Sequence, residues 1–366
     1  MNTQTLSSIE IYENHLKLTL DWLLSSIDNG KGGSSAHFSP LLGWSKPYPE
    51  TSGYIIPTLI ESSSFLNNPK YELAAKNIGN WLLEIQSDDG SWHGGLHPNS
   101  NLKGSVFNTG QILKGMIALY KNTNISDYLI AANNGADWLS KKVDDKGLWP
   151  NGDYRASQTP SYYTHVAWPI LEVSSNTGSI LQEEAAKRFL DNALSRKLLN
   201  GAIGGWGFND SGSAFTHTIA YTIRGFQESS RLIGDYEKYA KPMEQILDFF
   251  IRKAELSNGM LAGEFNEDLS ESAKYVCLTG NAQLAICILI MEKQNQDLRL
   301  VNAAAKLLDF IGSVQSKNHF FKGIKGGIAG SYPIWGRYMF MRYPNWAAKY
   351  YCDGLIRLIL RLKKEI

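Results

Sequence analysis

The sequence predicts an all-α fold, a closed (α/α)6 toroid in which an outer and an inner ring of helices surround a funnel. The first observation is an internal repeat, because residues 71–92 align with residues 128–149 without a gap, and Trp92 then meets Trp149. The second is that two kinds of helix alternate along the chain and that the last helix is as apolar as the others. Because an open array of repeats needs polar caps at both ends, an apolar end favours closure into a ring.

The first kind of helix is amphipathic. In residues 71–92 an apolar stripe runs from Ala74 to Ile85 at helical spacing. Gly90 marks the stop after this helix, because glycine readily adopts the left-handed backbone found at helix ends. The same pattern predicts six outer helices, at 8–28, 70–87, 127–142, 185–198, 236–254 and from about residue 298.

The second kind of helix is apolar nearly all round, as expected of a helix packed on both sides. Each outer helix is expected to pair with the inner helix that follows it, and the starts of the inner helices are expected to line one mouth of the funnel. Six segments have this character: 50–64, 106–119, 162–173, 215–233, 275–291 and 344–360.

The composition is consistent with a single toroid domain over residues 1–366, because 43% hydrophobic residues supply a large core. Aromatic residues make up 11% of the chain, so some of the rings are expected in a cleft. The formal net charge of +1 gives no electrostatic drive toward nucleic acid or anionic membranes, and neither is predicted as a partner.

The location of the protein follows from three features of the chain. Apolar runs such as 284–291 are too short to cross a bilayer, so no integral membrane segment is predicted. The N-terminus lacks the basic start and apolar run of a signal peptide. The three cysteines are odd in number and lie in helical patterns, which favours reduced thiols in a cytoplasmic protein. The sequence makes no prediction of the oligomeric state.

Residues 86–92 read QSDDGSW and resemble the QxxxGxW repeat of squalene cyclases and prenyltransferase-type toroids. The resemblance supports the toroid fold over most of the chain and implies nothing about the reaction. The acidic DxDD run of the cyclases is absent, and the Asp/Cys/His zinc set of the protein prenyltransferases has no counterpart.

A second resemblance is to toroid proteins encoded in bacterial exopolysaccharide gene clusters, and it implies work on a surface polysaccharide or its lipid-linked precursor. Phrases from four inner helices carry this resemblance: FNTGQ (107–111), YYTHVAW (162–168), FTHTIAYTIRG (215–225) and YPNWAAKYYCDGL (343–355).

Polar residues stand near the starts of the inner helices. Thr and Asn at the first positions are expected as helix caps. His165 and His217 follow a Thr at matching places in consecutive repeats, so a ring should bring both to the funnel. A neutral imidazole can act as base or acid, although each histidine could instead be a satisfied core residue. The polar positions one turn further in are Gln111, His165, His217, Tyr221, Asn281 and Lys349.

The loops before the inner helices repeat an aromatic residue. Each ring is interpreted either as a wedge between neighbouring hairpins or as a flat face for stacking a sugar, with Trp44, Trp206 and Trp335 as the stacking candidates. A glycine-rich run at 323–330 follows a helix rather than a strand, which excludes a nucleotide-binding loop. It is expected to form a flexible rim that leads to Tyr332, Trp335, Arg337 and Tyr338. The repeated positions are Trp44, Trp92, Trp149, Trp206, Phe265 and Trp335.

Three functions compete, and no cofactor is predicted for any of them. The first is a lyase or C5 epimerase that acts on a uronic acid of a polysaccharide by general acid/base chemistry. It requires a base, an acid and a group that neutralises the sugar carboxylate. The candidates are His165 or His217 as the base, Tyr221 or Tyr163 as the acid, and Arg337 or Asn108 for the carboxylate.

The second function is a glycoside hydrolase, which needs two carboxylates beside the scissile bond. Glu50 and Asp210 are the candidate pair, and Asp153 and Glu264 also fall near the mouth. The third is a non-catalytic toroid that binds a glycan or an isoprenoid. His93 and His97 have a metal-like spacing, but no Cys or carboxylate motif completes a site, so no metal is predicted.

Overall fold

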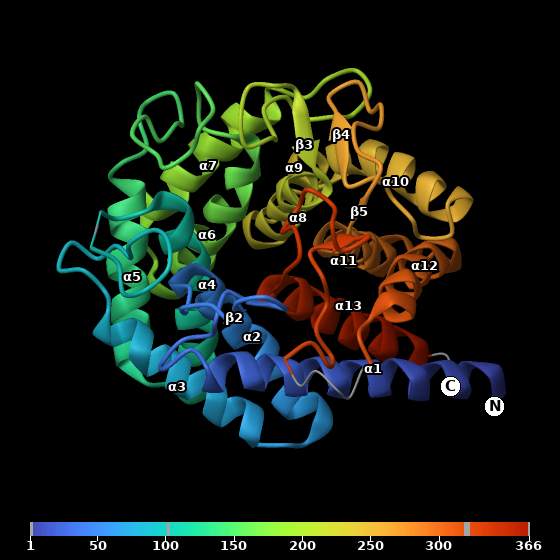
Figure 1. Cartoon of the computed structure of the whole chain (residues 1–366). Coiled ribbons are helices and arrows are strands. Elements are labelled where there is room, and N and C mark those ends of the chain that lie inside the picture. The colour runs from blue at the N-terminus through green and yellow to red at the C-terminus, as the bar shows by residue number, and fades with distance from the viewer. Residues whose placement is uncertain (1–2, 101–102, 318–322, 365–366) are drawn as a thin grey trace.

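The computed structural model describes residues 3–100, 103–317 and 323–364, and it confirms the all-α (α/α)6 toroid (Figure 1). Within these ranges, the outer ring consists of α1 (Thr3–Asp28), α3 (Lys70–Glu84), α5 (Ser126–Ser140), α7 (Ile180–Leu194), α10 (Glu244–Leu256) and α12 (Leu298–Val314). The inner ring consists of α2 (Pro49–Leu66), α4 (Val106–Thr123), α6 (Thr164–Thr177), α8 (Thr216–Ile233), α11 (Leu278–Asn295) and α13 (Asn345–Lys363).

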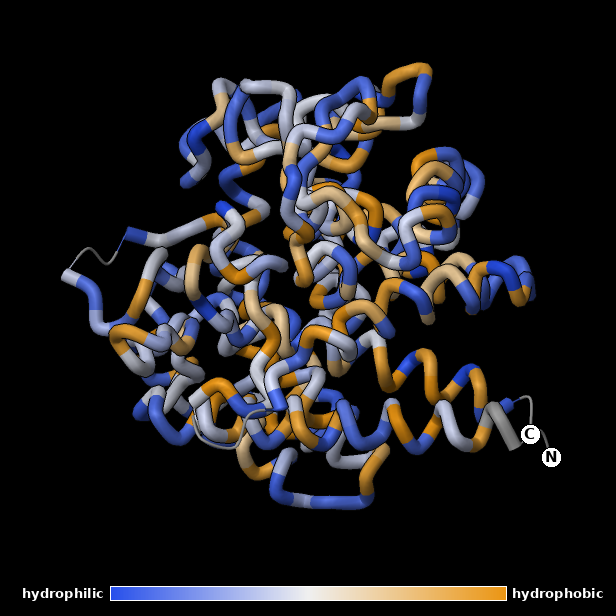
Figure 2. The backbone as a smooth tube through the Cα atoms, turned by 45° about the vertical axis from the view of Figure 1, so that its right-hand side comes forward, coloured by the Kyte–Doolittle hydropathy of each residue, from blue (hydrophilic) through white to orange (hydrophobic). Residues whose placement is uncertain are grey.

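The ring is closed by contacts between the two ends of the chain. Each inner helix contacts the next in the order α2, α4, α6, α8, α11 and α13, and α13 returns to α2. Helix α13 also packs against α1, so the N- and C-terminal ends lie close together (Figure 1). Figure 2 shows hydrophobic and hydrophilic residues alternating along the helices, as amphipathic packing requires.

The tight hairpins differ from those expected, because four of the inner helices pair with the outer helix that follows them. Helix α2 packs on α3, α4 on α5, α6 on α7 and α11 on α12, while α1 pairs with α13. The expectation that each outer helix pairs with the inner helix that follows it was therefore wrong. The physical reason is a short connection that begins with a left-handed residue at the end of the inner helix, at Asn67, Asn124, Gly178, Gly234 and Gln296.

Two helix boundaries also differ from the prediction. The expected helix over 236–254 is split into α9 (Tyr236–Tyr239), the 3-10 turn η2 (Lys241–Met243) and α10. Pro242 lies at the start of η2, where its missing N–H and fixed backbone angle prevent α9 from continuing. The expected helix over 162–173 begins with the 3-10 turn η1 (Ser161–Tyr163) before α6.

The long connections from outer to inner helices gather at one end of the ring and pair through short antiparallel strands. One sheet joins β1 (His37–Ser39) to β2 (Gly43–Trp44) and to β7 (Tyr343–Pro344). Strand β3 (Ser213–Phe215) pairs with β4 (Glu264–Asn266), and β5 (Val276–Cys277) pairs with β6 (Ser331–Tyr332). These strands connect neighbouring loops and hold this part of the rim in place.

The QxxxGxW motif is structural. The Gln86 amide donates to the carbonyls of Gly90 at 2.8 Å and Ala131 at 2.9 Å, which ties its own turn to α5. The Trp92 indole is buried and donates to the Leu82 carbonyl at 2.8 Å. Gly90 has a positive φ of 90°, and a Cβ there would lie 2.6 Å from the Asn134 carbonyl oxygen.

Further observations bear on the expected location. None of the described helices is both long and apolar enough to cross a membrane. Cys277, Cys287 and Cys352 are buried and unpaired, in keeping with the expectation of reduced thiols.

Candidate active site

A cavity of about 470 Å³ lies at the amino-terminal ends of the inner helices. Aromatic side chains make up most of its wall, and a few polar groups stand among them. Sites for small organic ligands commonly combine an apolar, aromatic lining with a few placed polar groups. The lining residues are Tyr48, Glu50, Thr51, Tyr54, Phe107, Asn108, Asp153, Tyr154, Arg155, Tyr162, Tyr163, Phe208, His217, Tyr221, Tyr338, Met339 and Trp346.

Glu50 is the buried acid of this cavity. It lies in the first turn of α2, directly after Pro49, whose fixed backbone favours a helix start. Burial raises the pKa of Glu50 to about 7; the Tyr48 hydroxyl opposes this rise and the nearby Asp153 charge adds to it. Because a raised pKa near 7 leaves both protonation states populated at neutral pH, Glu50 can give or take a proton.

Asp153 is the second carboxylate of the cavity and lies on the exposed connection between α5 and α6. It accepts hydrogen bonds from the Tyr163 hydroxyl at 3.0 Å and from the Ser105 hydroxyl. Ser105 also caps α4, since its oxygen accepts from the Asn108 backbone N–H at 3.1 Å. The cap of one inner helix thus positions a carboxylate from the neighbouring loop.

His217 lines the cavity and is enclosed by aromatic rings. Its imidazole centroid lies 4.6 Å from that of Tyr338 and 5.5 Å from that of Phe215. Burial lowers the pKa of His217 to about 3, so the imidazole is neutral at physiological pH. A neutral imidazole with so low a pKa is a weak base, whereas Glu50 titrates in the useful range.

His165 does not line this cavity and is fully buried beneath it. Its Nδ1 lies 3.0 Å from Lys114 Nζ and 3.0 Å from Gln111 Oε1, both on α4. The ring of Tyr221 covers it, with centroids 4.3 Å apart. The expected pair of funnel histidines is therefore not formed, because α4 supplies polar partners that hold His165 in the interface between the two helices.

The other predicted inner-helix residues divide between the cavity and the core. Tyr221, Asn108 and Tyr163 line the cavity. Gln111 donates to the His165 carbonyl at 2.9 Å, and the Asn281 amide donates to the Gly259 carbonyl at 2.6 Å. Both are fully buried, so neither offers a polar group to a ligand at the mouth.

Three predicted polar residues are held by protein partners and do not line the mouth cavity. Arg337 donates to Glu264 Oε2 at 2.5 Å and does not line the cavity, so its guanidinium is occupied by a protein carboxylate. Asp210 is exposed and accepts from the Ser157 backbone N–H at 2.9 Å, also outside the cavity lining. Lys349 lies deeper in the ring, 2.5 Å from Asp353. The carboxylate facing Glu50 is thus Asp153 rather than Asp210.

The loop aromatic residues act mainly as wedges. Trp206 is buried, so no ring face is open to a sugar, and this argues against the stacking role expected of it. Trp44 is partly buried against Trp22, with centroids 5.2 Å apart. Trp335 and Tyr332 are exposed by 66% and 41%, but neither lines the cavity.

Sequence reasoning missed several rings that form the wall, namely Tyr48, Phe107, Tyr154, Phe208 and Trp346, whereas Tyr338 was expected on the rim. The sequence did carry a signal for two of these rings, because Tyr48 and Phe107 lie within two residues of the predicted starts of inner helices.

No group of three or more His, Cys, Asp or Glu residues in the described part of the chain could hold a metal ion. His93 Nε2 instead lies 2.9 Å from His97 Nδ1.

No protein family model and no curated protein matches this chain. Solved structures do match over nearly the whole length. An unsaturated glucuronyl hydrolase specific for heparin is 16% identical, with a TM-score of 0.76 and 98% of each chain covered. A cellobiose 2-epimerase from Bacillus thermoamylovorans is 13% identical, with a TM-score of 0.77, and the match covers 99% of this chain and 100% of the epimerase.

An unsaturated glucuronyl hydrolase from a Bacillus species, described as responsible for glycosaminoglycan degradation, is 15% identical with a TM-score of 0.75. The match covers 95% of this chain and 96% of that one. The chain shares the (α/α)6 toroid fold of these enzymes. At these identities the likeness establishes the fold, and the chemistry has to be argued from the residues of this chain.

Proposed function

We propose that this toroid is a carbohydrate-active enzyme that cleaves a glycosidic bond, with Glu50 as the general acid and Asp153 as the partner carboxylate. The observation that carries the proposal is a buried Glu50, with a pKa of about 7, facing an aromatic cavity that also contains Asp153. Glycoside hydrolysis uses two carboxyl groups in different protonation states, and different environments separate those states.

The environments of the two groups differ, since Glu50 is buried and Asp153 is exposed. Glu50 is removed from water, which favours its neutral, proton-donating form. Asp153 accepts hydrogen bonds from Tyr163 and Ser105, an arrangement that suits a carboxylate because its oxygens act as acceptors. A glycosidic oxygen beside Glu50 would receive the proton, and Asp153 would stabilise the developing positive charge or activate a water.

A second candidate is proton abstraction from a sugar carbon, as in the uronic-acid lyase or epimerase expected from the sequence. His217 and Tyr221 both line the cavity and favour this chemistry. Arg155, the one Lys or Arg among the described lining residues, could hold a sugar carboxylate in place of Arg337. Hydrolysis ranks first because the low pKa of His217 makes it a poor base at neutral pH.

The likeness to hydrolases and an epimerase named for carbohydrate substrates supports a glycan as the substrate. The resemblance to exopolysaccharide-cluster toroids points toward a surface glycan or its lipid-linked precursor. The unpaired thiols of Cys277, Cys287 and Cys352 favour a reducing compartment, and we therefore propose a cytoplasmic enzyme.

The test is a turnover assay on a panel of defined oligosaccharides that includes unsaturated glucuronyl disaccharides, saturated uronic-acid oligomers and neutral β-linked disaccharides. New reducing ends report cleavage of a glycosidic bond by hydrolysis or by elimination. Proton NMR then separates hydrolysis from elimination, which forms a new unsaturated sugar, and from epimerisation, which forms no new reducing end. Glu50→Gln is expected to lower turnover by roughly 10²- to 10⁴-fold. Asp210→Asn is the matched control, since Asp210 lies outside the cavity lining, and it should leave turnover unchanged.

Either of two results would reject the assignment. Wild-type turnover by both Glu50→Gln and Asp153→Asn would exclude the two carboxylates from the reaction. Newly formed unsaturated sugars, or epimers without any new reducing end, would replace hydrolysis with the second candidate.

A further inference from the structure

A second cavity, of about 280 Å³, lies further along the inner helices than the mouth cavity. The order of the two cavities can be followed along helix α2. Glu50 and Tyr54 in its first part line the mouth cavity, and Tyr54, Thr58 and Glu61 further along line the second cavity. Tyr54 is buried between them. The side chains of Lys121 and Arg231, which are 48% and 59% exposed, also line the second cavity, so it opens to solvent at its own end.

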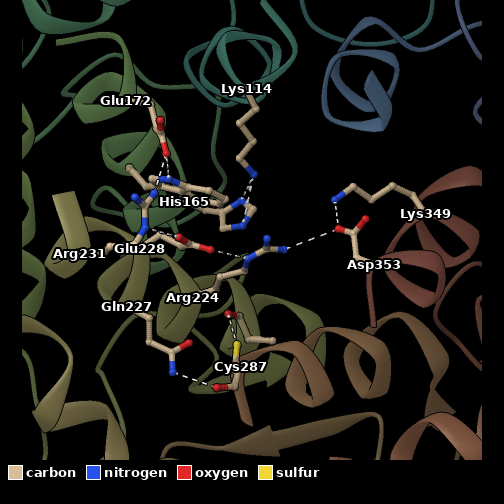
Figure 3. A network of polar contacts seen from close by, with 12 residues as sticks. Lys114, His165, Glu172, Arg224, Gln227, Glu228, Arg231, Cys287, Lys349 and Asp353 are labelled. Atoms are coloured by element: carbon tan, nitrogen blue, oxygen red, sulfur yellow. Dashed lines mark hydrogen bonds and ion pairs between the residues drawn. The ribbon is translucent and has the colours of Figure 1, made fainter. Parts of the chain in front are cut away.

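Basic side chains outnumber acidic ones in the wall of this cavity. Several of them are neutralised in pairs: Lys121 lies 2.7 Å from Glu172, and Lys349 lies 2.5 Å from Asp353. Arg231 bridges Glu172 and Glu228 (Figure 3). The basic residues of the wall are Lys114, Lys121, Arg224, Arg231, Lys349 and Arg357, and the acidic ones are Glu61, Glu172, Glu228 and Asp353.

Arg224 is the central cation of this wall and lacks full hydrogen bonding. It is 6% exposed, and its Nε and Nη1 have no hydrogen-bond partner in the part of the chain that the structure describes. The nearest carboxylate oxygens, on Glu228 and Asp353, are 3.7 Å and 3.9 Å away, beyond hydrogen-bond distance (Figure 3). These two ion pairs stabilise the charge of Arg224, but its Nε and Nη1 still have no hydrogen-bond acceptor among the described residues, and a ligand oxygen would supply one.

We propose that this second cavity is a binding site for an oxyanion, such as sulfate, inorganic phosphate or the phosphate group of a larger molecule. The planar guanidinium fork matches the oxygens of such a group, and Arg357, whose Nε also lacks a partner, lines the same wall. Lys114 from α4 and Lys349 from α13, the latter paired with Asp353, line the same wall and can donate hydrogen bonds.

The electrostatics of the neighbouring lysines agree with this proposal. Burial lowers the pKa of Lys114 well below its usual value, and the charges of Arg224 and Lys349 lower it further. The charges of Asp353 and Glu228 oppose this lowering, so the carboxylates already offset part of the repulsion among the cations. An oxyanion among them would relieve the repulsion. Glu61 is the competing carboxylate, and its removal should strengthen binding.

The test is binding of sulfate to the full-length protein, measured by calorimetry and by the shift in melting temperature, with chloride at equal ionic strength as the reference. We expect saturable binding by the wild-type protein. Arg224→Gln should weaken it by about tenfold or more, and Glu61→Gln should tighten it. Arg357→Gln provides a second, less buried position in case Arg224→Gln fails to fold.

Two controls locate the site. Arg155→Gln, in the mouth cavity, and Arg299→Gln, which removes an exposed cation paired with Glu255, should both leave sulfate affinity unchanged. Inorganic phosphate and glucose 1-phosphate are then compared: equal affinity indicates a site for the free anion, and tighter binding of the sugar phosphate indicates a larger ligand. Absence of saturable binding, or wild-type affinity in both Arg224→Gln and Arg357→Gln, would overturn the proposal.

Discussion

The negative charge of Asp153 raises the pKa of Glu50 across the mouth cavity, although the two residues belong to different repeats. Burial is the larger cause of the rise, and Asp153 adds to it. The coupling depends on the loop between α5 and α6, whose Asp153 is held by Ser105 at the start of α4. Acid strength at Glu50 is therefore a property shared by two neighbouring repeats.

The first prediction concerns the pH dependence of turnover. If Glu50 must be protonated to act, kcat/KM falls as the pH rises through about 7. Asp153→Asn removes a charge that raises this pKa, so the residual activity of that variant should lose its acid form at a lower pH than the wild-type enzyme. A pH–rate profile of both proteins measures the shift. If the alkaline limb of the pH–rate profile lies at the same pH in Asp153→Asn as in the wild-type enzyme, Glu50 does not control that limb.

The second prediction concerns stability. Because the pKa of Glu50 rises from an ordinary 4.5 to about 7 on folding, the folded state disfavours its charge. The contribution of Glu50 to the free energy of unfolding is fully present below about pH 4.5 and is lost as the pH rises to about 7. Glu50→Gln should therefore stabilise the protein at pH 8, by up to about 3 kcal/mol, and have little effect near pH 4. Urea unfolding at the two pH values tests this; equal effects at both would contradict it.

The third prediction separates the two histidines. His165→Ala leaves Lys114 without one of its contacts and opens a core cavity, so it should lower the free energy of unfolding by roughly 2–4 kcal/mol. Its turnover per folded molecule should remain close to that of the wild-type protein. His217→Ala changes the wall of the cavity. It should lower kcat/KM by about tenfold, because a bound substrate would lose a polar contact to the imidazole. Melting temperature and turnover are measured on the same preparations of both variants. Loss of turnover in His165→Ala with normal turnover in His217→Ala would refute the placement of His165 in the core and His217 at the site.

The fourth prediction concerns the loop tryptophans. Trp92 is fully buried and hydrogen-bonded to Leu82, so Trp92→Ala should cost about 3–5 kcal/mol of stability. Trp335 is 66% exposed, and Trp335→Ala should change stability by less than about 0.5 kcal/mol. Chemical denaturation of the two variants gives the comparison. Similar losses at both positions would show that Trp335 also acts as a wedge.

The fifth prediction concerns domain organisation, which we propose to be a single domain over residues 1–366. Helix α13 packs against α1 and α2, so removal of either end of the chain would open the ring. Limited proteolysis is expected to release no stable fragment comprising half of the chain. Recovery of a folded half-toroid would indicate two units instead.

The sequence alone determined the class of fold and the approximate positions of most helices. Apolar periodicity is a local property, and so are the Gly and Asn residues that stop a helix, which allows both to be recognised without knowledge of the neighbours. The same locality explains the pairing error. The periodicity shows where helices lie, but the length and geometry of the connections decide which neighbour each helix packs against.

The tertiary structure decided which polar residues form the candidate site. His165 and His217 occupy the same place in their repeats, yet α4 offers Lys114 and Gln111 to His165, while rings around the cavity enclose His217. Asp153 becomes the partner of Glu50, in place of Asp210, because its loop folds back to Ser105. The proton affinity of a carboxyl group depends on desolvation and on charges brought near it by the fold, and neither is encoded in the residues adjacent to it in the chain.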